Sequence, residues 1–172
     1  MTKTKIMLRA NIEKDNYDRI NKLLQGAATP AVKQKFDKEF DPSILKSTLN
    51  KSFIGLAKLK KQRVINQQQW TLLFPKNGAP SSSDFDLTLM ICLLRNFTDI
   101  DKSDVFPIET DTSDAASLLR LKHYRNNIVH SKTFTLSDED FKQYWEHITC
   151  GDAGGPLTCE INGNRVLVGV SA

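Results

Sequence analysis

The chain has 172 residues, of which 40% are hydrophobic, and it carries a formal net charge of +4 with a pI near 8.9. This length suits one domain of ordinary size with an appendage, and the hydrophobic content is sufficient for a buried core. The modest positive charge permits a nucleic-acid partner without requiring one. The three cysteines are too few and too scattered for a disulfide framework or a zinc site, and we expect neither a metal nor a cofactor.

The beginning of the chain contains an apolar island of three residues, Ile6 to Leu8, which Arg9 ends. A secretory signal needs a longer apolar stretch, and a membrane-spanning helix needs about 18 apolar residues or more. The sequence therefore predicts a soluble cytoplasmic protein with no membrane partner.

The first predicted helix covers Ile12 to Gln25, with Gly26 as its stop. Thr29 and Pro30 then open a second helix, because threonine caps helices and proline is tolerated at the first helical position. Apolar residues at three-to-four-residue steps predict the buried faces of both helices. These are Tyr17, Ile20, Leu23 and Leu24 in the first, and Val32, Phe36 and Phe40 in the second.

Asp41 and Pro42 end the second helix and begin a third by the same logic. The polar stretch from Lys46 to Ser52 is a point at which this run could break into two helices. The buried candidates of the run are Ile44, Leu45, Leu49, Phe53, Ile54, Leu56 and Leu59. A short helix capped by Asn66 follows and stops at Pro75.

Four cations lie at the end of the third run and before the short helix: Lys58, Lys60, Lys61 and Arg63. They are candidates for an RNA-binding patch, since Lys and Arg neutralise phosphates. The alternative is a solvated helix end, which is the commoner meaning of a charge run.

After a loop of turn residues, Ser83 and Asp86 resemble a capping box for a helix from Asp84 to Phe97. This helix is apolar on nearly every side, so we expect it to be central and the most buried.

The stretch from Ser113 to Ser131 predicts a helix with N-cap candidates at its start and a buried stripe of Leu118, Leu121, Tyr124 or Arg125, and Ile128. It brings Arg125, Asn126 and His130 onto one broad half-face. An arginine can hold a phosphate, a histidine titrates near neutral pH, and an amide can orient either. The alternative is a helix whose polar residues simply face water.

Ser137 and Asp140 cap a last helix that carries Phe141, Tyr144, Trp145 and Ile148. From Cys150 the chain is rich in glycine and then β-prone, with a predicted hairpin at Asn162 and Gly163. The fold class is therefore all-α, a bundle of about six helices with a short non-helical tail. The predicted boundaries are an N-terminal extension (1–14), a helical domain (15–149) and a tail (150–172).

Several segments, in order, resemble the HEPN superfamily, particularly the branch found in DAZ-interacting zinc-finger ubiquitin ligases. They are Asn16 to Leu24, Leu56 to Ile65, Gln69 to Pro75, Ser81 to Asn96, Asp111 to Asp114, Leu121 to Asn126, His130, and Phe141 to Ile148. The superfamily signature, an Arg followed by four to six residues and then a His, maps onto Arg125 and His130.

This resemblance implies a helical bundle that commonly forms homodimers. Active members are metal-independent endoribonucleases that leave 2′,3′-cyclic phosphates, with Arg125 stabilising the phosphate, His130 as general acid or base and Asn126 as a positioning residue. Other members are RNA-binding or protein-interaction modules in ubiquitin-ligase and innate-defence pathways. Both classes stay open, and neither His123 nor His147 is required by the motif, so both are expected at the surface.

The tail resembles the nucleophile segment of trypsin-like serine proteases, with Ala153 at the nucleophile's position. Alanine has no hydroxyl to attack a peptide bond, and a tail of this length cannot build a protease domain. We therefore expect no protease activity, and we expect the tail to pack weakly or to be disordered.

Overall fold

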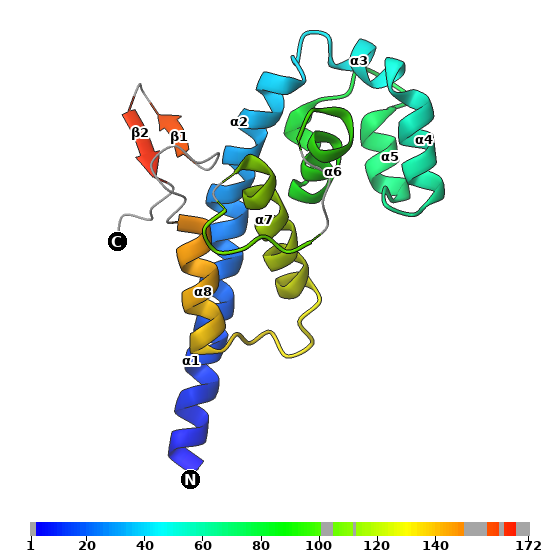
Figure 1. Ribbon diagram of the computed structural model, residues 1–172. Coiled ribbons are helices and arrows are strands. Elements are labelled where there is room, and N and C mark those ends of the chain that lie inside the picture. The colour runs from blue at the N-terminus through cyan, green and yellow to red at the C-terminus, as the bar shows by residue number, and fades with distance from the viewer. Residues whose placement is uncertain (1–2, 101–104, 112, 150–157, 162–163, 168–172) are drawn as a thin grey trace. The chain divides into compact units, whose positions relative to one another are not determined.

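The structure is a computed structural model that describes residues 3–100, 105–111, 113–149, 158–161 and 164–167. Within these residues the regular secondary structure is helical apart from one β-hairpin, which confirms the all-α prediction (Figure 1). The chain divides into two compact units, one formed by Met1–Ala31 with Asp104–Ala172 and the other by Val32–Ser103. None of the described helices combines the length and apolarity needed to cross a bilayer.

The first unit contains α1 (Lys3–Leu23), a π-helical turn η1 (Leu24–Ala28), α7 (Asp114–Val129), α8 (Asp138–Thr149) and the strands β1 (Thr158–Ile161) and β2 (Asn164–Leu167). The second contains α3 (Leu45–Lys51), α4 (Phe53–Lys61), α5 (Gln67–Leu73), the 3-10 turn η2 (Ser82–Asp84) and α6 (Leu87–Phe97). Helix α2 (Thr29–Glu39) contains the boundary between the units. The described residues thus hold eight α-helices rather than about six, partly because the run after Pro42 does break, at Ser52.

The predicted stop at Gly26 is wrong. The helix continues through Gly26 and widens into η1, where the backbone N–H and the hydroxyl of Thr29 both donate to the carbonyl of Leu24. Pro30 explains the widening, because proline lacks the N–H that a regular helix would pair with the carbonyl four residues earlier and its ring crowds that carbonyl. Thr29 is therefore a donor inside a continuous helix and not an N-cap.

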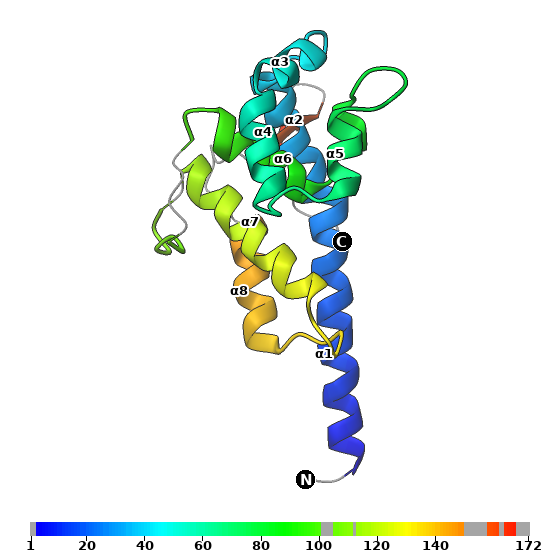
Figure 2. The same cartoon turned by 90° about the vertical axis from the view of Figure 1, so that its right-hand side faces the viewer.

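In the first unit, α1, α7 and α8 lie side by side (Figure 1 and Figure 2). The buried amide of Asn16 on α1 donates to the Leu136 carbonyl (3.3 Å) and to Asp138 Oδ1 (2.7 Å), and Tyr17 Oη donates to the Ile128 carbonyl (3.2 Å). These bonds tie the end of α7 and the connection to α8 onto α1. Ser137 caps α8 as predicted, since its Oγ accepts from the Asp140 N–H at 3.1 Å.

In the second unit, α6 is the most buried helix, as predicted, with Leu89, Met90, Leu93 and Leu94 fully enclosed. A Cβ added to Gly55 on α4 would meet the Phe97 ring at 2.9 Å, so α4 and α6 approach closely there. Asn66 and Gln69 form the capping box of α5. Asn66 is thus the cap that the sequence predicted.

The start of α6 differs from the prediction. Asp86 itself is the N-cap, with its Oδ1 accepting from the Leu89 N–H at 2.7 Å, and the Ser83–Asp86 capping box does not form. Gln69 Nε2 also donates to the Asp86 carboxylate, at 3.1 and 3.3 Å. This contact from a distant helix holds Asp86 at the cap position, while Ser83 falls in η2.

The third predicted run buries Leu45, Leu49 and Leu56 as expected. Three of its other candidates are exposed: Ile44 (56%), Phe53 (48%) and Ile54 (86%). Because the break at Ser52 restarts the helical register, Phe53 and Ile54 no longer share the buried face of α3, while Ile44 is the N-cap residue that precedes α3.

The two strands pair antiparallel from Thr158↔Leu167 to Ile161↔Asn164, which confirms a hairpin in the tail. The predicted turn residues Asn162 and Gly163 lie outside the described residues, as does Ala153. The predicted domain boundaries and the expected weak packing of the tail stay predictions.

Gln69 joins two helix caps, so its removal should destabilise the fold. Its side chain is buried (6% exposed), accepts from the Asn66 N–H at 3.1 Å and donates to Asp86. We expect Gln69→Ala to lower the free energy of unfolding by about 1–2 kcal/mol, through the lost bonds to the Asn66 N–H and to the Asp86 carboxylate. Urea unfolding measures this, and the exposed neighbour Gln68→Ala should change it by less than about 0.5 kcal/mol. Equal losses in the two variants would contradict the linking role of Gln69.

Candidate functional site

Helix α7 carries the first candidate site, and its N-terminus is built from local polar contacts. Ser113 Oγ accepts from the Ala116 N–H at 3.2 Å, and Asp111 Oδ1 accepts from the Ser113 N–H at 2.9 Å. The sequence predicted caps in this cluster but not the role of Arg120. This buried guanidinium donates to the carbonyls of Asp111 (2.7 Å) and Ile108 (2.6 Å), and so fixes the loop before α7.

The predicted buried stripe of α7 is confirmed, and Tyr124 rather than Arg125 occupies its middle position. Tyr124 is 1% exposed and stacks on Tyr144 of α8 with ring centroids 4.1 Å apart. Arg125 lies at the edge of this stripe and Asn126 is turned away from it, and both residues are half-buried.

The structure brings Arg125 and Asn126 together, because Arg125 Nη1 donates to Asn126 Oδ1 at 3.3 Å. His130 ends the helix, and its backbone N–H donates to the Asn126 carbonyl at 2.9 Å. Its imidazole is exposed and forms no hydrogen bond with the residues that the structure describes. The three candidates therefore lie within the last turns of one helix, with a side-chain bond between two of them.

The second candidate site is the C-terminal end of α4. The chain leaves the helix through a left-handed residue, Arg63, whose φ is 61°. The Arg63 N–H donates to the Lys60 carbonyl (3.0 Å) and the Val64 N–H to the Leu59 carbonyl (3.0 Å), which is the Schellman pattern usually completed by glycine. An arginine there has a strained backbone, and such strain is concentrated at functional positions.

The four cations of this segment lack carboxylate partners among the described residues. Lys58, Lys61 and Arg63 are exposed, while the half-buried Lys60 places its Nζ 4.6 Å from the centroid of the Trp70 ring. The surrounding sequence also carries charge of only one sign. From Pro42 to Ser83 the chain holds seven Lys and Arg residues and not one Asp or Glu.

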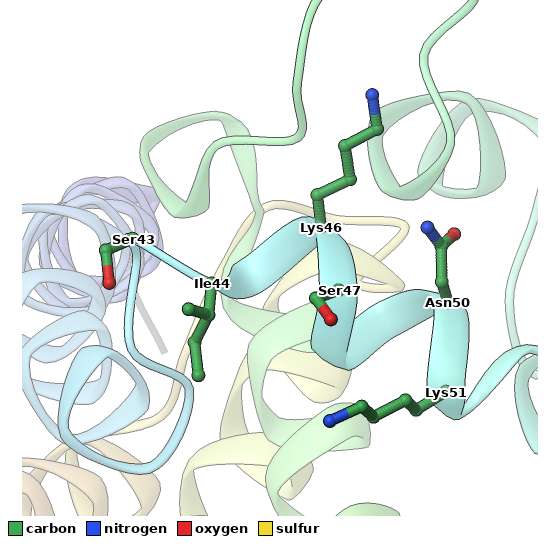
Figure 3. Close-up of a pocket in the computed structure, with 6 residues that line it drawn as sticks. All are labelled: Ser43, Ile44, Lys46, Ser47, Asn50 and Lys51. Carbon is green, nitrogen blue, oxygen red and sulfur yellow. The ribbon is translucent and has the colours of Figure 1, made fainter.

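A groove of about 640 Å³ lies along α3 in the same unit, lined by Ser43, Ile44, Lys46, Ser47, Asn50 and Lys51. Figure 3 shows that the side chains of Lys46 and Lys51 extend toward different sides of the helix. The two ammonium groups therefore do not converge on one ion. The groove adds positive charge to this unit but is not a defined ligand site.

A family model described as DZIP3/hRUL138-like HEPN matches residues 42–150. The chain belongs to this HEPN family. The match contains α3 to α8, with both candidate sites, and it confirms the family indicated by the sequence motifs. No curated protein and no solved structure matches the chain significantly.

This HEPN domain also contains a polar network between α7 and α8 that the sequence analysis missed. Asn127 Nδ2 contacts Tyr144 Oη (2.8 Å) and His123 Nε2 (3.0 Å), while the Tyr124 hydroxyl bonds His147 Nδ1. The expectation that His147 lies free at the surface is wrong, because it is half-buried against Tyr124, whereas His123 is exposed as expected. The signal was the spacing of Tyr144 and His147, three residues apart on an amphipathic helix, which puts both on one face.

Burial sets the protonation of this network. It raises the pKa of Tyr124 to about 12 and raises the pKa of Tyr144, so both phenols keep their protons at neutral pH. Burial, followed by the positive charge of Arg120, lowers the pKa of His147, against a smaller opposing effect of Glu109 and Glu146. At neutral pH the bond therefore joins a protonated phenol to a neutral imidazole. The described residues include no group of three or more His, Cys, Asp or Glu able to hold a metal.

The lowered pKa of His147 predicts acid sensitivity. Below its ordinary value of 6.5 the unfolded chain takes up a proton that the folded domain resists, so stability falls as the pH falls through 6.5 and levels off below the folded pKa. Urea unfolding between pH 7.5 and 5 should show this decline. His147→Gln, which keeps an acceptor, should flatten it, and His130→Gln should not. An unchanged pH profile in His147→Gln would contradict the assignment.

Proposed function

We propose that this HEPN domain is a binding module for RNA, with Lys58, Lys60, Lys61 and Arg63 as its phosphate contacts. The observation that carries the proposal is the cationic end of α4, which has no carboxylate partner among the described residues and stands in a 42-residue stretch free of acids. Surface cations on a solvated helix are normally interspersed with carboxylates. An uncompensated cluster instead creates a positive field that attracts polyanions.

Phosphate binding would gain its free energy largely from the release of counterions condensed on the nucleic acid. The Schellman turn at Arg63 supports this role, because it directs the chain sharply away just after Lys60 and Lys61 and leaves both near the end of the helix. Homodimers and a ubiquitin-ligase or innate-defence context belong to this proposal through the family. A dimer would present two such clusters and strengthen binding to a long strand.

RNA binding should weaken steeply with salt, and neutralising the four cations with Gln should remove most of that dependence. For a single strand, each lost phosphate contact reduces the slope of log K against log salt by about 0.7. Fluorescence anisotropy of a labelled RNA at several salt concentrations measures the slope.

The matched control replaces four exposed lysines of the other unit, Lys14, Lys22, Lys132 and Lys142, with Gln. Both variants have the same net charge, so only the position of the lost cations differs. A salt-independent interaction, or equal losses in the two variants, would contradict RNA binding at α4 and favour a protein partner.

Endoribonuclease activity at Arg125, Asn126 and His130 is the second candidate. It is supported by the hydrogen bond that joins Arg125 to Asn126 and by the exposed imidazole of His130 on the same helix end. In this reaction the ribose 2′-hydroxyl attacks the adjacent phosphorus and the 5′-oxygen leaves, giving a 2′,3′-cyclic phosphate. His130 would either take the proton from the attacking 2′-hydroxyl or give a proton to the leaving 5′-oxygen. Arg125 would stabilise the negative charge on the phosphate oxygens.

If the domain is a nuclease, it should cleave single-stranded RNA in EDTA, and Arg125→Ala or His130→Ala should each lower the rate by about 10²- to 10⁴-fold. The matched control is His123→Ala, an exposed histidine of the same helix. End analysis should find cyclic phosphates. Absence of cleavage by the folded wild-type domain would leave it a binding module only.

A further inference from the structure

An aromatic cluster lies between α4 and α5. Phe53 is the first residue of α4, and Trp70 of α5 contacts both Phe53 and Lys60, which lies in the last turn of α4. The Phe53 ring packs edge-on against Trp70 (centroids 5.7 Å apart) and Phe74 (5.3 Å), and Trp70 and Phe74 are 4.7 Å apart. Trp70 and Phe74 are half-buried, but Phe53 keeps 48% of its surface exposed. Its neighbours therefore hold the ring in place without covering it.

Two of the four cations lie toward the side of α4 that carries Phe53. Lys60 and Lys61 follow it by seven and eight residues, which is two turns of helix. Lys60 lies over the Trp70 ring, so Trp70 contacts both the exposed phenylalanine and the lysine. An ammonium group over an indole face is attracted by the ring quadrupole, which restricts the Lys60 side chain.

Isolated exposed apolar residues are common on protein surfaces and need no explanation. Phe53 differs because its ring is held by two other aromatic rings and stands within two helical turns of two cations, in a stretch without acids. An aromatic ring beside a row of cations is the pattern with which proteins bind single-stranded nucleic acids, where bases stack on the rings and phosphates contact the cations.

We infer that the α4–α5 face of this domain binds single-stranded nucleic acid by stacking an unpaired base on Phe53 while Lys60 and Lys61 contact the flanking phosphates. This inference rests on the RNA-binding function proposed above and names its ligand as a strand with unpaired bases. A duplex cannot use this face in the same way, because its bases are already stacked on one another and only its phosphates are accessible.

The test compares Phe53→Leu, which keeps apolar packing but removes the aromatic face, with Phe53→Tyr, which keeps the ring. Binding of a short fluorescent oligouridine should weaken at least about fivefold in Phe53→Leu and remain near wild type in Phe53→Tyr. Ile54→Ala is the matched control, since Ile54 is the adjacent residue and is 86% exposed. Thermal unfolding confirms that each variant is folded.

A strand of the same length without bases separates stacking from charge. It should bind wild type and Phe53→Leu equally, because it offers only phosphates. A 2-aminopurine nucleotide in the strand gives an independent signal on the wild-type protein, since stacking quenches its emission.

The outcomes distinguish the two proposals. If no strand binds, both the RNA-binding function and this inference fail. If binding depends on salt and on the four cations, but Phe53→Leu binds as wild type and 2-aminopurine emission is unchanged, the RNA-binding function stands and the stacking site is overturned.

Discussion

The packing of Tyr124 against α8 is the constraint on which the geometry of the first unit depends. The Tyr124 ring is fully buried and stacks on Tyr144. The Tyr124 hydroxyl forms a hydrogen bond with His147. A helix with one residue held this firmly has no freedom to rotate about its axis, so the directions of Arg125 and Asn126 follow from it. The family motif is therefore positioned by an aromatic contact that is not itself part of the motif.

The second unit achieves order in a different way, through polar side chains that join helix ends. Gln69 completes the cap of α5 and holds the cap of α6, so one amide orients two helices. The same unit leaves the four cations from Lys58 to Arg63 without carboxylate partners among the described residues, and it leaves the Phe53 ring half exposed. An unpaired surface charge and an exposed ring face add little to the stability of the fold, and a left-handed arginine opposes it. Because stability of the fold does not explain these cations, the exposed ring and the Arg63 backbone, we interpret them as parts of a binding surface.

The two candidate sites differ in what supports them. Arg125 and His130 were indicated by a spacing shared with a family, and the structure joins Arg125 to Asn126 without engaging the imidazole of His130 among the described residues. The α4 cations were indicated by composition alone, and the structure adds a held aromatic cluster beside them. For this reason binding is the proposed function and cleavage the second candidate.

The sequence by itself determined the class of fold and the caps at Asn66 and Ser137. It also marked residues 111–114 as N-cap candidates for α7 and residues 46–52 as a stretch at which the third run could break. These depend on bonds between side chains and backbone a few residues apart, which a local pattern contains. Only the tertiary structure decided that the helix passes through Gly26, that Asp86 caps α6, that Phe53 is exposed and that His147 is held by Tyr124. With the exception of Gly26, where Pro30 lies close by, these involve contacts between helices. Gln69 of α5 contacts Asp86, Trp70 and Phe74 contact Phe53, and Tyr124 of α7 contacts His147. Burial and hydrogen-bond partners are set by that packing, and a local pattern does not contain it.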